Sequence, residues 1–145
     1  MNAERFVYVT YIATTPGKVW DALTRGELTR EYWKHENVSD WRPGSRWEHV
    51  TADGKRTVKL VGEVLESVPD QRLVLTWGEV ADAGDRTKQS RVAIDIETVG
   101  GMVRVTVTHD RLSADGLRKI SNGWPRVMSS LKSLLETGRP LDTWA

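Results

Sequence analysis

The first part of the chain combines one apolar strand pattern with two short helical patterns. Residues 6–12 are β-branched and aromatic throughout, which predicts a strand. Thr15-Pro16 fits a helix start, because Thr15 can cap the first turn and a proline is tolerated within it. We expect this helix to end at Gly26 and a second short helix to cover residues 28–33.

The middle of the chain changes to a period of two, which is typical of strands. Residues 34–45 show no such period and contain a Pro-Gly turn signal, so we expect a loop there. Asp53-Gly54 and Gly100-Gly101 are hairpin signals, and the Gly-, Asp-, Ala- and Lys-containing stretch 78–89 predicts an exposed loop. The strand patterns cover residues 46–51, 58–68, 73–77, 92–96 and 103–109.

A continuous apolar stripe near the C-terminus predicts one long amphipathic helix. We expect Asn122 to cap it, Pro125 to lie in its first turn, Gly138 to end it and Pro140 to prevent its continuation. The residues of the stripe are Trp124, Val127, Met128, Leu131, Leu134 and Leu135.

The order of these elements predicts an α+β fold. One strand, two short helices, about five more strands and a long helix make an antiparallel sheet of about six strands. The long helix must bury its stripe, and the concave face of the sheet is the available apolar surface. We therefore expect one domain over residues 1–145, with the curved sheet wrapped around the C-terminal helix and a cavity between them.

Composition narrows the classes of function. The 145 residues include 21 Lys and Arg and 20 Asp and Glu, so the net charge of +1 does not favour a nucleic-acid partner. The absence of cysteine excludes disulfides, thiolate metal sites and a cysteine nucleophile, and it fits a reducing cytoplasm, where we expect the protein. We expect no membrane-spanning segment and no signal peptide, because no apolar run has the length or setting of either.

Seven segments carry recognisable motifs: 15–24, 43–47, 62–66, 72–77, 106–109, 123–125 and 131–138. Together they resemble the SRPBCC (START-like, Bet v 1-like) superfamily, and most closely the activator of heat-shock protein 90 ATPase homologue-like family. The family's Gly-Gly pair before the second strand reads Gly44-Ser45 here. The resemblance implies a helix-grip fold with a hydrophobic cavity, in a superfamily of lipid carriers, polyketide cyclases, aromatases and hormone receptors.

Seven tryptophans offer large flat surfaces, suited either to the core or to a cavity wall. Trp20, Trp77 and Trp124 come from three separate elements at apolar phases, and we expect at least two of them to line the cavity. An apolar cavity with a few polar groups is the usual site for a small molecule. The residues expected around the cavity are Trp20, Trp47, His49, Trp77, Ile94, Val105, Val107, His109, Trp124 and Met128.

Two histidines are the candidate polar groups of this cavity. His109 shares its phase with Val105 and Val107; it is a structural residue, a ligand contact or, least favoured, a catalytic base. His49 shares its phase with Trp47, and we favour the inward orientation for both because it removes the indole from water. Glu48 then faces solvent.

Other catalytic arrangements are not indicated. No histidine pair has zinc-motif spacing, and no nucleophile elbow surrounds a serine, so we expect neither a metal nor a cofactor. Ser129, Ser130 and Ser133 are expected at the edge of the helical stripe.

The favoured function is therefore the binding of a small hydrophobic molecule of lipid, polyketide or aromatic type. The alternatives are a chaperone-type protein interaction in stress response and a cyclase- or hydrolase-like enzyme that uses a cavity histidine. A homodimer is left open.

Overall fold

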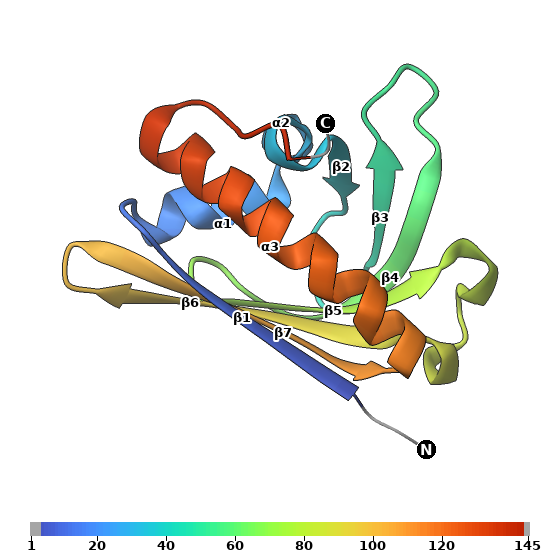
Figure 1. The fold of residues 1–145 in the computed structure, drawn as a ribbon. Coiled ribbons are helices and arrows are strands. Elements are labelled where there is room, and N and C mark those ends of the chain that lie inside the picture. The colour runs from blue at the N-terminus through green and yellow to red at the C-terminus, as the bar shows by residue number, and fades with distance from the viewer. Residues whose placement is uncertain (1–3, 144–145) are drawn as a thin grey trace.

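A computed structural model describes residues 4–143 and shows a seven-stranded antiparallel sheet that curves around a long C-terminal helix (Figure 1). The sheet order is β1-β7-β6-β5-β4-β3-β2. The elements are β1 (Glu4–Ile12), α1 (Pro16–Thr24), α2 (Gly26–Trp33), β2 (His35–Val38), β3 (Arg46–Thr51), β4 (Val58–Val68), β5 (Arg72–Glu79), the 3₁₀ turns η1 (Val80–Asp82) and η2 (Arg86–Lys88), β6 (Ser90–Val99), β7 (Met102–Leu112) and α3 (Ala114–Thr137).

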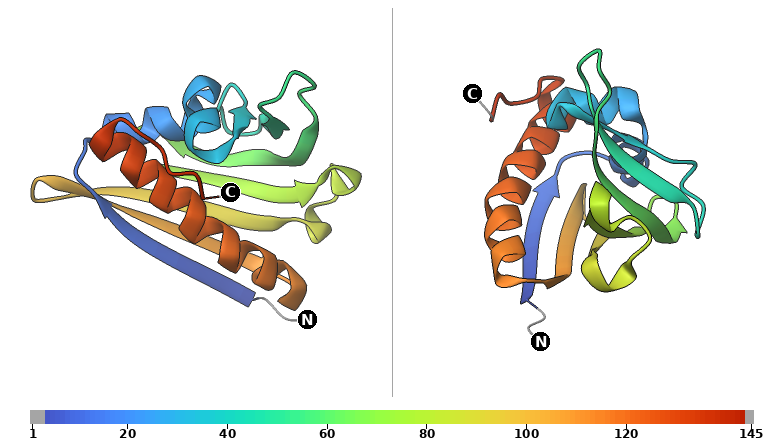
Figure 2. Two further views of the ribbon diagram at one scale, coloured as in Figure 1. Left: turned by 45° about the horizontal axis from the view of Figure 1, so that its top comes forward. Right: turned by 90° about the vertical axis from the view of Figure 1, so that its right-hand side faces the viewer.

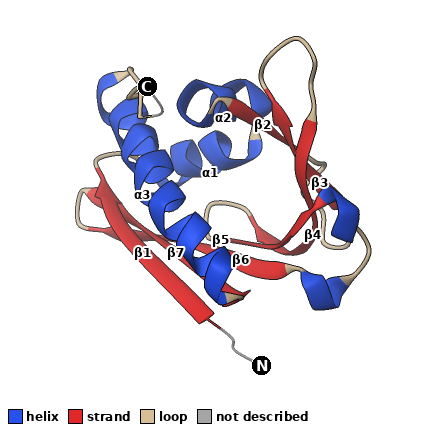
Figure 3. Ribbon diagram, turned by 45° about the vertical axis from the view of Figure 1, so that its right-hand side comes forward, coloured by secondary structure: helices blue, strands red, loops and turns tan. Residues whose placement is uncertain are grey.

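The elements form a cup with α3 inside it. Figure 3 shows β3 and β4 bending up on one side while β1, β7 and β6 run beneath α3, and the two short helices close one end. This is the helix-grip α+β fold that the sequence predicts. The main core lies between α1, α3 and strands β1, β6 and β7, and a smaller cluster surrounds Trp47 at the bend of the sheet.

The sheet has one strand more than the six expected. Residues 34–45 are not entirely loop, because 35–38 form β2 at the sheet edge and pair with β3. The sequence His-Glu-Asn-Val has no alternation of apolar and polar residues that would reveal a strand. A tertiary contact holds it instead: the backbone N–H of Asn37 donates to Thr29 Oγ1 of α2 at 3.0 Å.

Two helix boundaries also differ from expectation. Gly26 begins α2 instead of ending α1, because Arg25 takes an extended conformation between the helices and no left-handed residue is needed. The long helix starts at Ala114, with Ser113 as its cap, so Asn122 and Pro125 lie inside it. At its other end Gly138, with a φ of 84°, closes α3 as predicted.

The C-terminal segment folds back along α3. Leu141 donates its backbone N–H to Ser130 Oγ at 3.0 Å, and Asp142 pairs at 3.2 Å with Lys34, the residue that follows α2. Ser130 is therefore buried as an anchor for this segment and does not lie at the edge of the stripe. Among residues 4–143, no helix has the length and apolar composition needed to cross a bilayer.

Candidate functional site

A cleft of about 700 Å³ opens between the N-terminal half of α3 and the segment that joins β5 to β6. In Figure 2 this half of α3 is the orange end of the helix, and the turns η1 and η2 are yellow-green and lie across from it. The end of β7 completes the wall. The lining residues that matter below are Trp33, Trp77, Ser90, Ile120 and Trp124.

Three tryptophans form the apolar wall of the cleft, one each from α2, β5 and α3. Trp33 stacks on Trp77 with ring centroids 6.3 Å apart. Trp124 lies 5.4 Å from Trp33 and 5.6 Å from Trp77 at steep angles. Offset and edge-on geometries of this kind are those in which aromatic rings attract one another. The rings therefore hold one another in place and leave the cleft with a preformed aromatic surface.

A chain of hydrogen bonds runs behind this wall. The indole Nε1–H of Trp124 donates to Nδ1 of His109 at 3.1 Å. Nε2 of His109 lies 2.7 Å from Ser90 Oγ, and Ser90 donates to the backbone carbonyl of Trp77 at 3.2 Å. Because an indole N–H only donates, Nδ1 of His109 is the unprotonated nitrogen and Nε2 carries the hydrogen.

Burial fixes His109 in its neutral form. The side chain is fully buried, and this desolvation lowers its pKa to about 4. In the neutral tautomer described above, Nε2 has no lone pair with which to take the proton of Ser90. Although the two atoms lie close together, His109 therefore cannot serve as the base that would activate Ser90 as a nucleophile. His109 instead orients the Ser90 hydroxyl.

A second polar network links β3, β2 and α2 on the side of the β3–β4 hairpin. Nδ1 of His49 donates to Asn37 Oδ1 at 2.6 Å, and Thr29 Oγ1 both accepts from Asn37 and donates to the carbonyl of Gly26. Desolvation, and secondly the charge of the stacked His35 ring, lower the pKa of His49 to about 3. His49 thus links β3 to β2 and α2 as a neutral residue.

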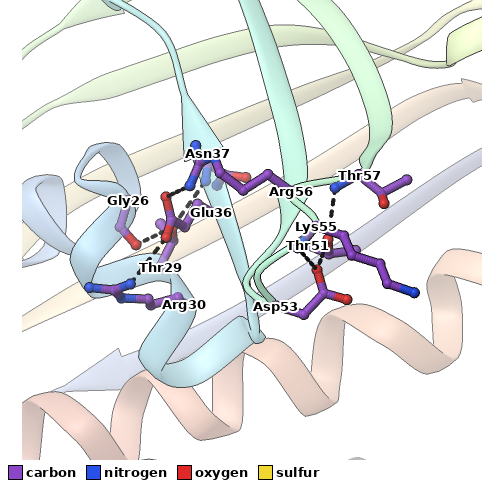
Figure 4. A network of polar contacts seen from close by, with 10 residues as sticks. All are labelled: Gly26, Thr29, Arg30, Glu36, Asn37, Thr51, Asp53, Lys55, Arg56 and Thr57. Carbon is purple, nitrogen blue, oxygen red and sulfur yellow. Dashed lines mark hydrogen bonds and ion pairs between the residues drawn. The ribbon is translucent and has the colours of Figure 1, made fainter.

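The ion pairs of Glu36 reinforce the same region, as Figure 4 shows. Its carboxylate contacts Arg56 at 2.9 Å and Arg30 at 3.3 Å, which ties the β3–β4 hairpin and α2 to β2. Within that hairpin Asp53 accepts from Thr51 and Lys55. These contacts position α2, and with it Trp33 at the rim of the cleft.

The structure gathers the expected cavity residues into one region at different depths. Trp77 and Trp124 line the cleft. Trp47 and His49 point inward and are buried, as the inward alternative predicts, while half-buried Glu48 pairs with Arg46 on the other side of the strand. The remaining members pack in the core around the cleft: Ile94, Val105, Val107, His109 and Met128 are buried, and half-buried Trp20 bridges the two apolar clusters.

Sequence reasoning missed three residues of the site: Trp33, Ser90 and Ile120. Ile120 lies in the part of α3 that precedes the apolar stripe. Trp33 ends the short helix that the sequence does predict, but nothing in that pattern places it opposite Trp77. Ser90 falls at the border of a predicted loop, where a serine carries no signal. Its place opposite Trp77 in the β5–β6 register, and its contact with His109, are tertiary facts.

Charged side chains at the rim balance one another. Lys88, Arg111 and Lys119 face the cleft together with Glu79, Asp82 and Asp115. Within the part of the chain that the structure describes, no group of three His, Asp or Glu side chains could hold a metal ion. The lining therefore carries no net charge and offers uncharged hydrogen-bonding groups such as Ser90 beside the charged ones.

Comparison with known proteins places the chain in a family. The model of the family described as "Activator of Hsp90 ATPase homolog 1-like protein" matches residues 13–136. No curated protein matches the chain.

Solved structures share the fold at low sequence identity. CalU16 from Micromonospora echinospora is 20% identical, with a TM-score of 0.77 over 97% of this chain and 78% of that one. The Aha1 dimer from Colwellia psychrerythraea is 20% identical, with a TM-score of 0.75 over 93% and 98% of the two chains. PFC0360w, an HSP90 activator from Plasmodium falciparum, is 19% identical, with a TM-score of 0.68 over 83% and 86%. On the family match over most of its length, the chain belongs to the Activator of Hsp90 ATPase homolog 1-like proteins of the SRPBCC superfamily.

Proposed function

We propose that this protein binds a small molecule with an apolar, ring-containing body in the cleft beneath the N-terminal half of α3. The observation that supports the proposal is the preformed wall of Trp33, Trp77 and Trp124 on a cleft of about 700 Å³. Small-molecule sites commonly have volumes of roughly 300–1,000 Å³ and a mostly apolar lining with a few polar groups. Cofactors and metals are not part of the proposal.

Blocking the cleft tests this function. Ile120→Trp places a large ring on a residue that lines the cleft, while Asn122→Trp adds the same ring to an exposed position of the same helix. The probe is 2-isopropenylnaphthalene, titrated by calorimetry with the protein in the syringe because the hydrocarbon is sparingly soluble. We expect saturable binding by the wild type and the Asn122 variant, and at least a tenfold loss for Ile120→Trp. Absence of saturable binding by the wild type, or equal binding by all three, contradicts the proposal.

A second candidate function is contact with another protein through β1. This edge strand exposes Val7, Val9 and Tyr11 by 48%, 47% and 41%, on the face that points away from α3. A long edge strand with apolar outward residues is a surface for pairing with another chain. Family membership and the HSP90 activator among the structural neighbours suggest a chaperone of the Hsp90 class; the dimeric neighbour suggests a second copy.

The variant Val9→Lys tests this surface, and two separate assays distinguish a second copy from an Hsp90-class partner. The substitution places a charge in the centre of the exposed row, and Thr98→Lys is the control on an exposed position of β6. We expect Val9→Lys to lower either the dimer fraction in sedimentation velocity or the stimulation of an Hsp90 ATPase, and the control to lower neither. A wild-type protein that is monomeric and leaves the ATPase rate unchanged contradicts this candidate without affecting the cleft proposal.

A further inference from the structure

Every hydrogen bond of the chain behind the tryptophan wall points in one direction. Trp124 donates to His109, and neutral His109 donates to Ser90. Ser90 is the last member, and it lies in the wall of the cleft, whereas His109 is buried behind it. The chain therefore delivers a hydrogen-bond donor, the hydroxyl hydrogen of Ser90, to the surface that a ligand would touch.

The hydroxyl hydrogen of Ser90 has a weak partner in the absence of a ligand. Its bond to the Trp77 carbonyl is 3.2 Å long, which is longer than the roughly 2.5–3.0 Å usual for a hydroxyl donor. Hydrogen bonds that follow one another in the same direction also polarise each other, so the two donations behind Ser90 strengthen it as a donor. A hydroxyl can rotate, and a ligand acceptor in the cleft can replace the carbonyl at small cost.

The charged side chains that line the cleft carry no net charge. Three cationic and three anionic side chains line the cleft, and Asp115 is already shared between Arg118 and Lys119. Two other hydroxyls line the cleft. That of Thr87 donates to Asp85 at 2.5 Å, and that of Ser113 accepts the N–H of Gly116 as the cap of α3. Ser90 is thus the hydroxyl that stands beside the aromatic wall with a hydrogen to give.

From this arrangement we infer that Ser90 selects the ligand class: ring-containing molecules that carry an oxygen acceptor, such as a ketone, quinone or phenolate oxygen, next to the ring. The rings pack on Trp33 and Trp77, and the oxygen accepts the Ser90 hydrogen. His109 and Trp124 are positioning residues that fix the direction of that hydrogen. The inference rests on the proposed binding function and adds its polar selectivity.

Two probes of one shape measure this selectivity. In 2-acetylnaphthalene a carbonyl oxygen replaces the terminal methylene of 2-isopropenylnaphthalene, so the pair differs in one acceptor. The hydrocarbon is the more poorly solvated in water, and its absolute affinity therefore includes a larger hydrophobic contribution. The quantity that reports on Ser90 is the ratio of the two dissociation constants, compared between variants by calorimetry.

Ser90→Ala removes the donor, and the ratio should shift about tenfold against the ketone, as expected for one lost hydrogen bond. The affinity for the hydrocarbon should change by less than twofold. Ser90→Thr keeps the hydroxyl and should preserve the wild-type ratio. Thr87→Val, which removes the hydroxyl that is bound to Asp85, is the matched control and should also preserve the ratio.

Trp124→Phe supplies an independent variant that keeps an aromatic ring but removes the first donor of the chain. Nδ1 of His109 then loses its partner, the direction of the chain is no longer fixed, and the ratio should shift in the same direction by a smaller factor. A structural role of Trp124 alone would weaken both probes equally.

The outcomes distinguish the inference from the function on which it rests. If both probes bind and the ratio is the same in the wild type, Ser90→Ala and Trp124→Phe, the inference is overturned and the cleft remains a binding site. If neither probe binds the wild type, both are overturned. If Ser90→Ala does not fold, the ratios of the wild type, Ser90→Thr and Trp124→Phe decide whether the inference holds.

Discussion

The two halves of α3 lie over the same sheet but meet it differently. From Trp124 onward the helix is packed: Val127, Met128 and Leu131 are buried against the strands. Over residues 114–123 none of the side chains is buried, and the cleft lies beneath them. The same helix therefore seals the core at one end and forms the roof of a binding site at the other.

The difference arises from side-chain size as well as from the shape of the cup. The first half contributes Gly116 and Gly123, and its larger apolar residues Leu117 and Ile120 are half-buried. The second half carries an unbroken apolar stripe that fills the space above β1, β6 and β7. Packing and an open site thus compete for the same sheet face, and the length of the stripe sets the boundary between them.

Leu131→Ala should produce the largest effect and mark the packed half. The side chain is fully buried, so its truncation leaves a cavity and should lower the free energy of unfolding by about 2–5 kcal/mol. Urea unfolding measures the change. A loss below about 1 kcal/mol would mean that this part of α3 is not closely packed on the sheet.

Gly62→Ala should also be costly, because Trp47 packs directly on this glycine. A Cβ at position 62 would lie 1.9 Å from the Thr76 carbonyl oxygen and 2.3 Å from Trp47 Nε1, and these two atoms form the 2.7 Å hydrogen bond of the indole. We expect a loss of about 3 kcal/mol from overpacking, measured by urea unfolding. Gly123→Ala is the control on the open side, where no atom lies within 4 Å of the added carbon. Equal effects of the two substitutions would contradict the contrast.

Acid should weaken the fold through His109, which lies at the junction of the packed and open regions. Its folded pKa of about 4 is below the ordinary value of 6.5, so the unfolded chain binds a proton that the folded chain does not. This contribution is complete above pH 6.5 and is lost as the pH falls towards 4; at pH 4.5 the loss is about 2–3 kcal/mol. His49, with a pKa of about 3, acts in the same direction.

His109→Gln isolates this effect, because the amide can accept from Trp124 and donate to Ser90 without titrating. Free energies of unfolding from urea titrations at pH 7 and pH 4.5 should differ by less in the variant than in the wild type. An identical difference in both proteins would show that His109 does not stay neutral in the fold.

Ile120→Ala should have the smallest effect and mark the open half. The side chain is half-buried at the cleft, so its truncation enlarges an existing space, and we expect a loss of about 1 kcal/mol or less. The comparison with Leu131→Ala in the same unfolding assay is direct, since both residues lie on one helix. A loss as large as that of Leu131→Ala would mean that the cleft is closed in solution.

The contrast also explains which predictions from sequence succeed. The spacing of apolar residues along the chain reflects which side chains are buried. It therefore predicts the buried half of α3 and the strands beneath it. It places the start of α3 near Asn122 because the stripe ends there, although the helix continues back to Ser113, which accepts the N–H of Gly116 at 2.9 Å. In the same way β2 escapes detection, since it is held by Thr29 and by β3 and not by an apolar face of its own.

Local propensity and burial leave their pattern in neighbouring residues. The amino-acid sequence therefore predicts the order of the elements other than β2, the α+β helix-grip class, the inward orientation of Trp47 and His49 and the helix end at Gly138. The tertiary structure alone decided where the stripe leaves the sheet uncovered, which tryptophans meet across that space, and that Ser90 stands at the end of a chain from Trp124 through His109. These features are contacts between residues that are far apart in the chain, and a pattern among neighbouring residues does not reveal which distant residues meet.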